Sequence, residues 1–125
     1  MNVHDAVGGE PFFSELVDRF YDGVSTDLLL RPLYPDDLSD SRRHMRMFLQ
    51  QYWGGPTTYD QERGHPRLRM RHAPFVIGEA ERDAWLGHML ASLDAVCQVH
   101  GTPPEHVAAI RDHLVNAADF LVNAR

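Results

Sequence analysis

Residues 64–75 read GHPRLRMRHAPF, and this stretch decides how the rest of the chain is interpreted. It predicts a short helix around Leu68 to His72, because Pro74 cannot continue a helix and restricts the residue before it. His72 then closes a short, proline-limited helix. Since Met70, Phe75 and Ile77 surround it in sequence, its ring can direct one nitrogen into an apolar space.

Long amphipathic helices are predicted on both sides of this stretch. Apolar residues at helical spacing predict helices from Glu10, from Ser41 to Tyr52 after the cap-type residues 36–40, from Glu79 to Val99 and from Pro103 onward. Gly8-Gly9 and Gly54-Gly55 end helical segments, and the polar residues 56–66 predict a long loop. Alternating strand patterns are absent from the sequence. We therefore predict one all-α domain over residues 1–125.

Composition narrows the class of protein. The chain has 125 residues, 43% hydrophobic and 24% charged, as in an ordinary globular domain. No apolar run approaches the roughly 20 residues of a membrane span, and the N-terminus lacks a signal-peptide layout. With Cys97 as its single cysteine the chain forms no internal disulfide, so we expect a cytoplasmic protein. The net charge of −6 argues against nucleic acid or anionic lipid as main partner.

The basic residues are all arginine and are concentrated in one segment. Seven of the twelve lie between residues 42 and 71, where only Asp60 and Glu62 are acidic, so this segment carries +5 and the remainder −11. Two interpretations stay open. The segment forms a solvated basic face, or it binds a small polyanion, since arginine offers forked donors to carboxylates.

Few of the eight histidines are in a context that suggests chemistry. Zinc-site spacings of histidine and cysteine are absent, and His106 and His113 fit surface positions on an amphipathic helix. A haem iron requires a neutral imidazole whose other nitrogen donates to a backbone carbonyl, and His72 suits that role. The position of His72 in the sequence, taken alone, also fits a surface histidine or a buried core histidine.

Three polar-tipped aromatic residues are predicted on inward faces, namely Tyr21, Tyr34 and Trp85. Buried tyrosine and tryptophan need partners for their O–H and N–H groups. They could surround a small polar ligand, or they could be core residues bonded to backbone carbonyls. Cys97 lies on a helical stripe and is interpreted as core packing rather than as a nucleophile.

Three runs in the sequence closely resemble the group II truncated haemoglobins of bacteria. They are FLQQYWGGP at residues 48–56, GHPRLRMRHAPF at 64–75 and ERDAWL at 81–86, and the opening DAVGG at 5–9 matches as well. The resemblance covers nearly the whole chain and is weakest at residues 97–115. It implies a two-over-two helical sandwich around haem b, in which the B and E helices pack against the G and H helices.

The resemblance also implies roles for particular residues. His72 corresponds to the proximal iron ligand of the family, and Tyr21, Tyr34 and Trp85 correspond to its distal donors. Ser41 falls where many globins place a distal histidine or glutamine, and its short hydroxyl is a weak donor. The expected haem pocket consists of Phe20, Met45, Phe48, Leu49, Met70, Phe75, Ile77 and Met89. The expected partners of the haem propionates are Arg46, Arg69, His44 and Tyr52.

The implied function is reversible binding of O₂, CO or NO, as in oxygen transport, by a monomer or homodimer. The alternative is haem-dependent redox turnover, either nitric oxide dioxygenation or a peroxidase-like reaction, supported by an unidentified reductase. His44 could also swing toward the iron as a second axial ligand. A helical interaction module with a basic face is the interpretation that involves no haem.

Overall fold

Four long helices carry the fold, and shorter segments join them. The computed structural model describes residues 2–124. Its elements are α1 (Val3–Ala6), α2 (Glu10–Val24), the 3-10 helix η1 (Arg31–Leu33), α3 (Ser39–Tyr52), α4 (Thr58–Arg63), α5 (Leu68–His72), α6 (Glu79–His100) and α7 (Pro104–Phe120). The described residues contain no strand, so the all-α prediction is confirmed.

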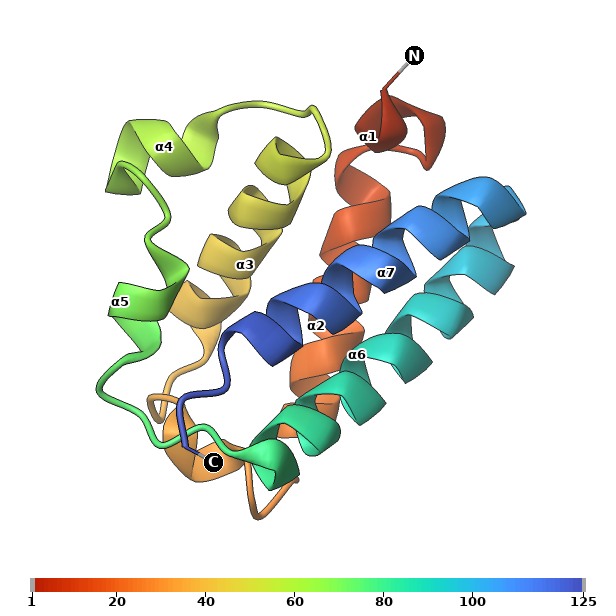
Figure 1. Ribbon diagram of the computed structural model, residues 1–125. Coiled ribbons are helices and arrows are strands. Elements are labelled where there is room, and N and C mark those ends of the chain that lie inside the picture. The colour runs from red at the N-terminus through yellow and green to blue at the C-terminus, as the bar shows by residue number, and fades with distance from the viewer. Residues whose placement is uncertain (1, 125) are drawn as a thin grey trace.

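The long helices form two layers. Figure 1 shows α6 and α7 side by side in front of α2, with α3 beside α2. The closest packing joins α2 to α6, α6 to α7 and α2 to α3. The short helices α4 and α5 lie beyond α3 and close the open side of the molecule (Figure 1).

The core forms where α2 meets the α6 and α7 layer. Phe13, Leu16 and Phe20 of α2 are almost fully buried, together with Leu93 of α6 and Leu114 of α7. Burying each such side chain contributes about 1.5–3 kcal/mol. This apolar seam fixes the two layers and leaves the remaining inner surface of α3, α6 and α7 available for a cavity.

The N-terminal turn docks on the end of α3 through one Gly-Gly pair. Gly54 has a positive φ of 101°, which favours glycine, and its carbonyl accepts a 2.9 Å hydrogen bond from the Asn2 side chain. A Cβ on Gly55 would lie 2.6 Å from the His4 ring. The pair therefore ends α3 and also permits the close approach of α1.

One predicted loop is partly helical. Residues 58–63 form α4, although their sequence TYDQER has no apolar periodicity. Tyr59 is buried against Phe48, with ring centroids 5.6 Å apart, and the Asp60 N–H donates to the Gln51 side chain at 3.0 Å. The prediction of a loop was wrong here because one anchor residue and a contact to α3 hold this helix.

No helix within residues 2–124 combines the length and the apolar character that crossing a membrane requires.

Candidate functional site

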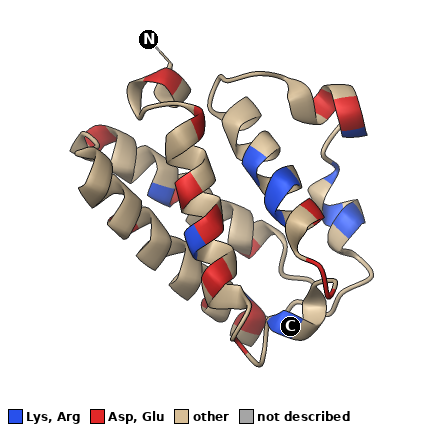
Figure 2. Ribbon diagram, turned by 180° about the vertical axis from the view of Figure 1, so that it is seen from behind, with Lys and Arg blue, Asp and Glu red and all other residues tan. Residues whose placement is uncertain are grey.

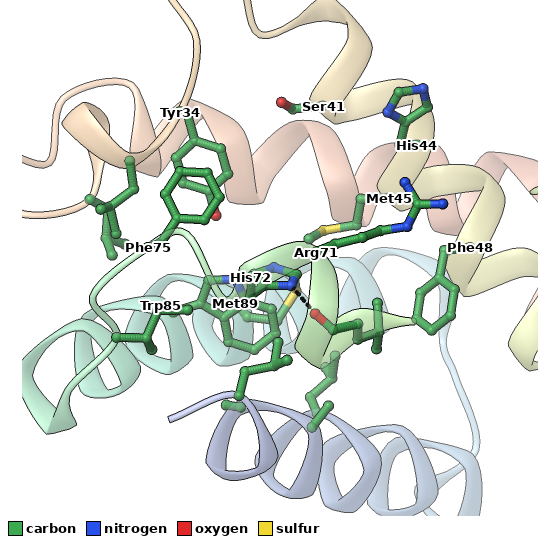
Figure 3. Close-up of a pocket in the computed structure, with 18 of the residues that line it drawn as sticks. Tyr34, Ser41, His44, Met45, Phe48, Arg71, His72, Phe75, Trp85 and Met89 are labelled. Carbon is green, nitrogen blue, oxygen red and sulfur yellow. Dashed lines mark hydrogen bonds between the residues drawn. The ribbon is translucent and has the colours of Figure 1, made fainter. Parts of the chain in front are cut away.

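A cavity of about 380 Å³ opens between the two layers, and its wall is mostly apolar. It receives side chains from all the helices α2 to α7 and from the η1 segment, and Figure 3 shows many of them. The residues predicted from sequence that line it are Tyr21, Tyr34, Ser41, His44, Met45, Phe48, Leu49, His72, Phe75, Ile77, Trp85 and Met89. A cavity of this volume holds a cofactor-sized ligand.

His72 contributes an imidazole to the cavity wall from the last position of α5. Its Nδ1 lies 2.7 Å from the backbone oxygen of Leu68, one turn earlier in the helix (Figure 3). A carbonyl oxygen can only accept, so Nδ1 donates in this contact, and the neutral form of the ring with that proton has its lone pair on Nε2. The site thus provides one imidazole nitrogen free to bind a metal.

Tyr34 and Trp85 form a polar pair on the cavity wall. Both side chains line the cavity, and the Trp85 side chain is close enough to Tyr34 to affect the pKa of its hydroxyl. Burial raises the pKa of Tyr34 to about 12, and the contact with Trp85 opposes that rise. The Tyr34 hydroxyl therefore stays protonated at neutral pH and remains a hydrogen-bond donor.

Tyr21 supports this pair from α2. Its ring meets that of Tyr34 edge to face, with centroids 5.5 Å apart. Burial raises the pKa of the Tyr21 phenol, nearby Tyr34 raises it further and Arg42 opposes the rise. Tyr21, Tyr34 and Trp85, the three aromatic residues singled out in the sequence, therefore meet at one end of the cavity.

Arg63, beside His44, gives another part of the wall a cationic edge. Arg63 approaches the His44 ring nitrogens at 3.0 Å. Burial lowers the pKa of His44, and the charges of Arg63 and Arg43 lower it further, so this histidine is neutral at pH 7. Arg63 Nε is buried without a hydrogen-bond partner among the described residues. The charge of the Arg63 guanidinium on the cavity wall favours an anionic group at the cavity edge.

Two residues expected in the pocket lie outside its lining. Phe20 is fully buried behind it, edge to face with Tyr21 and Trp85 at centroid distances of 4.9 and 5.4 Å. Met70 is 58% exposed. On the short α5 it stands two positions before His72, a spacing that does not place two side chains on one helix face.

Three residues expected to bind propionates also lie outside the cavity lining. Tyr52 stacks on His113 with ring centroids 3.8 Å apart, and Arg69 lies 4.8 Å from the centroid of the Phe120 ring. Arg46 does not line the cavity either. His44 is therefore the one residue of that set on the cavity wall.

The sequence interpretation missed Arg63, Arg71 and His113, which line the cavity. Both arginines belong to the basic segment, but Arg71 is held by the backbone oxygens of Pro66 and Arg63 at 2.7 and 3.0 Å. His113 was wrongly assigned to the surface, for it is partly buried and burial lowers its pKa. The surplus of arginine signalled such a site without indicating which arginines form it.

These residues fit haem. The macrocycle requires an apolar slot, the iron requires a neutral imidazole, and the two propionates require cations at the slot's edge. The apolar lining provides the slot, His72 the imidazole and the guanidinium of Arg63 a cation. A helical sandwich around a slot of this kind is the architecture of a globin.

Comparisons with known proteins agree with this class. The family model for bacterial-like globins matches residues 2–119. The group 2 truncated haemoglobin YjbI of Bacillus subtilis is 48% identical over 88 residues, which cover 70% of this chain and 67% of that protein. The thermostable haemoglobin of Thermobifida fusca is 48% identical, with a TM-score of 0.93 and 98% of both chains covered. The group II truncated haemoglobin of Bacillus anthracis is 39% identical, with a TM-score of 0.91, covering 99% of this chain and 98% of that one.

The chain belongs to the bacterial-like globin family and, within it, to the group II truncated haemoglobins. This confirms the two-over-two sandwich expected from the sequence. Membership of the globin family also implies that the protein binds haem and oxygen.

Proposed function

We propose that the protein binds O₂, and also CO and NO, reversibly at haem b held by His72. The hydrogen bond between His72 Nδ1 and the Leu68 oxygen supports this proposal most directly, because it leaves Nε2 as the metal-binding nitrogen. Haem, when bound, supplies the iron atom that takes up the diatomic gas. A backbone acceptor on the far nitrogen also raises the basicity of the ring and fixes its orientation.

Trp85 and Tyr34 provide the polar contacts for the gas. The indole N–H is a donor only, and the Tyr34 hydroxyl can both donate and accept. Because both groups are held within a mostly apolar cavity, a ligand that develops negative charge is stabilised there more strongly than in water. The same pair discriminates in favour of O₂ over the less polar CO.

His44 and Arg63 complete the proposed site at the cofactor edge. Arg63 carries the charge that a propionate requires, and its Nε still lacks a partner. His44 remains neutral beside it because of burial and the neighbouring arginines. We assign Arg63 as the main propionate partner, in place of Arg46 and Arg69.

An absorption spectrum of the purified protein tests the proposal. We expect an intense Soret band and a ferrous form whose spectrum changes on addition of O₂ and returns on its removal. A protein purified with added haem that shows no Soret band would contradict haem binding. Irreversible oxidation on each exposure to O₂, together with conversion of NO to nitrate, would instead favour the redox alternative.

A further inference from the structure

The segment that follows α7 lies against the loop that leaves His72 (Figure 1). Asn123 uses both ends of its side-chain amide on this loop. Its Oδ1 accepts from the Ile77 N–H at 2.8 Å, and its Nδ2 donates to the Phe75 oxygen at 2.9 Å and to the His72 oxygen at 3.4 Å. One side chain thus contacts three residues of the loop.

The backbone of the same segment adds two further bonds. The N–H groups of Asn123 and Ala124 both donate to the Ile77 oxygen, at 2.8 and 3.1 Å. A Cβ on Gly78 would lie 3.3 Å from the Ala124 oxygen, so the loop and the segment after α7 approach each other closely. We refer to Asn123 and Ala124 together as the C-terminal clamp.

The loop depends on this clamp because it has few hydrogen bonds of its own. After α5, the Phe75 N–H donates to the His72 oxygen at 3.0 Å, and no helix begins until Glu79. Within residues 2–124, the Phe75 oxygen and the Ile77 N–H have no hydrogen-bond partner other than Asn123. Removing Asn123 therefore leaves both groups to water.

The loop also forms the wall of the cavity next to His72. Phe75 and Ile77 line the cavity, and Leu121, just before the clamp, lines it too. His72 is consequently fixed at two points. Its ring is held by the Leu68 oxygen within α5, and its backbone continues into a loop that the clamp holds.

We propose that Asn123 is a positioning residue for His72, which sets the imidazole orientation by holding the loop at residues 73–77. This inference rests on the proposed ligation of haem by His72. Loss of the clamp would let the loop and the end of α5 shift, so the His72 imidazole would be held less firmly in the orientation that haem ligation requires. Asn123 does not line the cavity, so it acts on His72 through the backbone of the loop.

Two measurements on the haem-loaded protein test the proposal, for Asn123→Ala and for Asn116→Ala as control. Asn116 is an exposed residue of α7 on which the cavity does not depend. We expect Asn123→Ala to speed amide hydrogen exchange at Ile77 by about tenfold, as for loss of a typical hydrogen bond. We also expect its iron–histidine stretching band in the ferrous resonance Raman spectrum to shift or broaden. Asn116→Ala should change neither.

The conservative variant Asn123→Asp keeps an acceptor for the Ile77 N–H and should restore most of its protection from exchange. An unchanged Ile77 exchange rate in Asn123→Ala would overturn the clamp. Faster exchange with an unchanged Raman band would overturn the positioning role. Persistence of that band in His72→Ala would instead show that His72 is not the ligand, which separates failure of the proposed function from failure of the clamp.

Discussion

The two walls of the cavity are built in different ways. Tyr21 and Trp85 stand on long helices, and the fully buried Phe20 packs behind both of them. His72 stands on a helix of only five residues, and its neighbours Met70 and Phe75 are 58% and 40% exposed. The wall with the polar aromatic residues thus belongs to the hydrophobic core, whereas the wall with the proposed metal ligand is held by hydrogen bonds.

The charge distribution follows the same division. Figure 2 shows arginines gathered on α3 and α5 and acidic residues along α2. Arg42 joins the two regions by pairing with Asp18 and Asp22 at 3.1 Å each. The side of α3 and α5 therefore carries the cations that an anionic cofactor edge requires, whereas α2 on the core side is mainly acidic. Each of the following changes affects one wall more than the other.

Replacement of the proposed ligand should have the largest effect. His72→Ala removes the proposed metal-binding nitrogen. The variant should lose most of its haem during purification, since no other imidazole lies at the end of α5. Apparent thermal stability should fall as well, because a ligand that binds only the native state stabilises it. Haem content by the pyridine haemochrome assay measures the effect. His106→Ala, on α7 and outside the cavity lining, is the control; full haem content in His72→Ala would refute the assignment.

Substitutions in the core wall should lower the free energy of unfolding more than substitutions in the wall that contains His72. Leu93 is fully buried on α6, and Leu93→Ala should lower the free energy of unfolding by about 2–5 kcal/mol through lost burial and a cavity. Met70→Ala, on the exposed face of α5, should change it by less than about 0.5 kcal/mol. Urea denaturation of both variants provides the comparison. Equal losses would mean that α5 contributes to the core as much as α6 does.

Removal of the indole donor should affect O₂ selectively. Trp85→Phe keeps an aromatic ring but deletes the N–H, so the O₂ dissociation rate should rise about ten- to a hundredfold, as for loss of a hydrogen bond worth roughly 1.5–3 kcal/mol. CO dissociation should change little. Stopped-flow displacement measures both rates. Trp53→Phe is the matched control, because Trp53 does not line the cavity; equal acceleration of O₂ and CO would indicate that Trp85 acts through shape alone.

Loss of the positive charge of Arg63 should have a smaller effect, on the rate at which haem leaves the protein. Arg63→Ala should speed haem transfer to an acceptor protein by several-fold, since a partly exposed ion pair contributes about 0–1 kcal/mol. The difference from the wild type should shrink as salt rises. Arg46→Ala, outside the cavity, should leave the rate unchanged. Acceleration in Arg46→Ala but not in Arg63→Ala would restore the assignment made from the sequence.

The smallest effect should be a pH dependence from two histidines. Burial lowers the pKa values of His44 and His113 in the folded protein. The unfolded chain then binds more protons than the folded one below a pH of about 6.5, so stability is full above that pH and decreases as pH falls. Urea midpoints at pH 7 and 5 should differ less in His113→Gln than in the wild type. An identical pH response in both proteins would exclude His113 as a contributor.

The sequence by itself determined the helices and the family. The apolar spacing of residues 10–24 specified a long amphipathic helix because such a helix buries one face. Pro74, which has no backbone N–H, limited α5, and the residues from Glu79 onward form the next long helix. The dense resemblance around GHPRLRMRHAPF identified the group II truncated haemoglobins and directed attention to His72, Tyr21, Tyr34 and Trp85. The structure places all four on the cavity wall.

The tertiary structure decided which polar side chains face the cavity. Arg46, Arg63 and Arg69 all belong to the basic segment, and the sequence does not distinguish them. Packing of the helices placed Arg63 on the cavity wall and Arg69 against the Phe120 ring. The same holds for α4, which depends on burial of Tyr59, and for Asn123, whose partners lie 46 to 51 residues away in the chain. Periodicity reports which face of a helix is apolar, but contacts between distant segments depend on how the helices pack, and local sequence does not encode that packing.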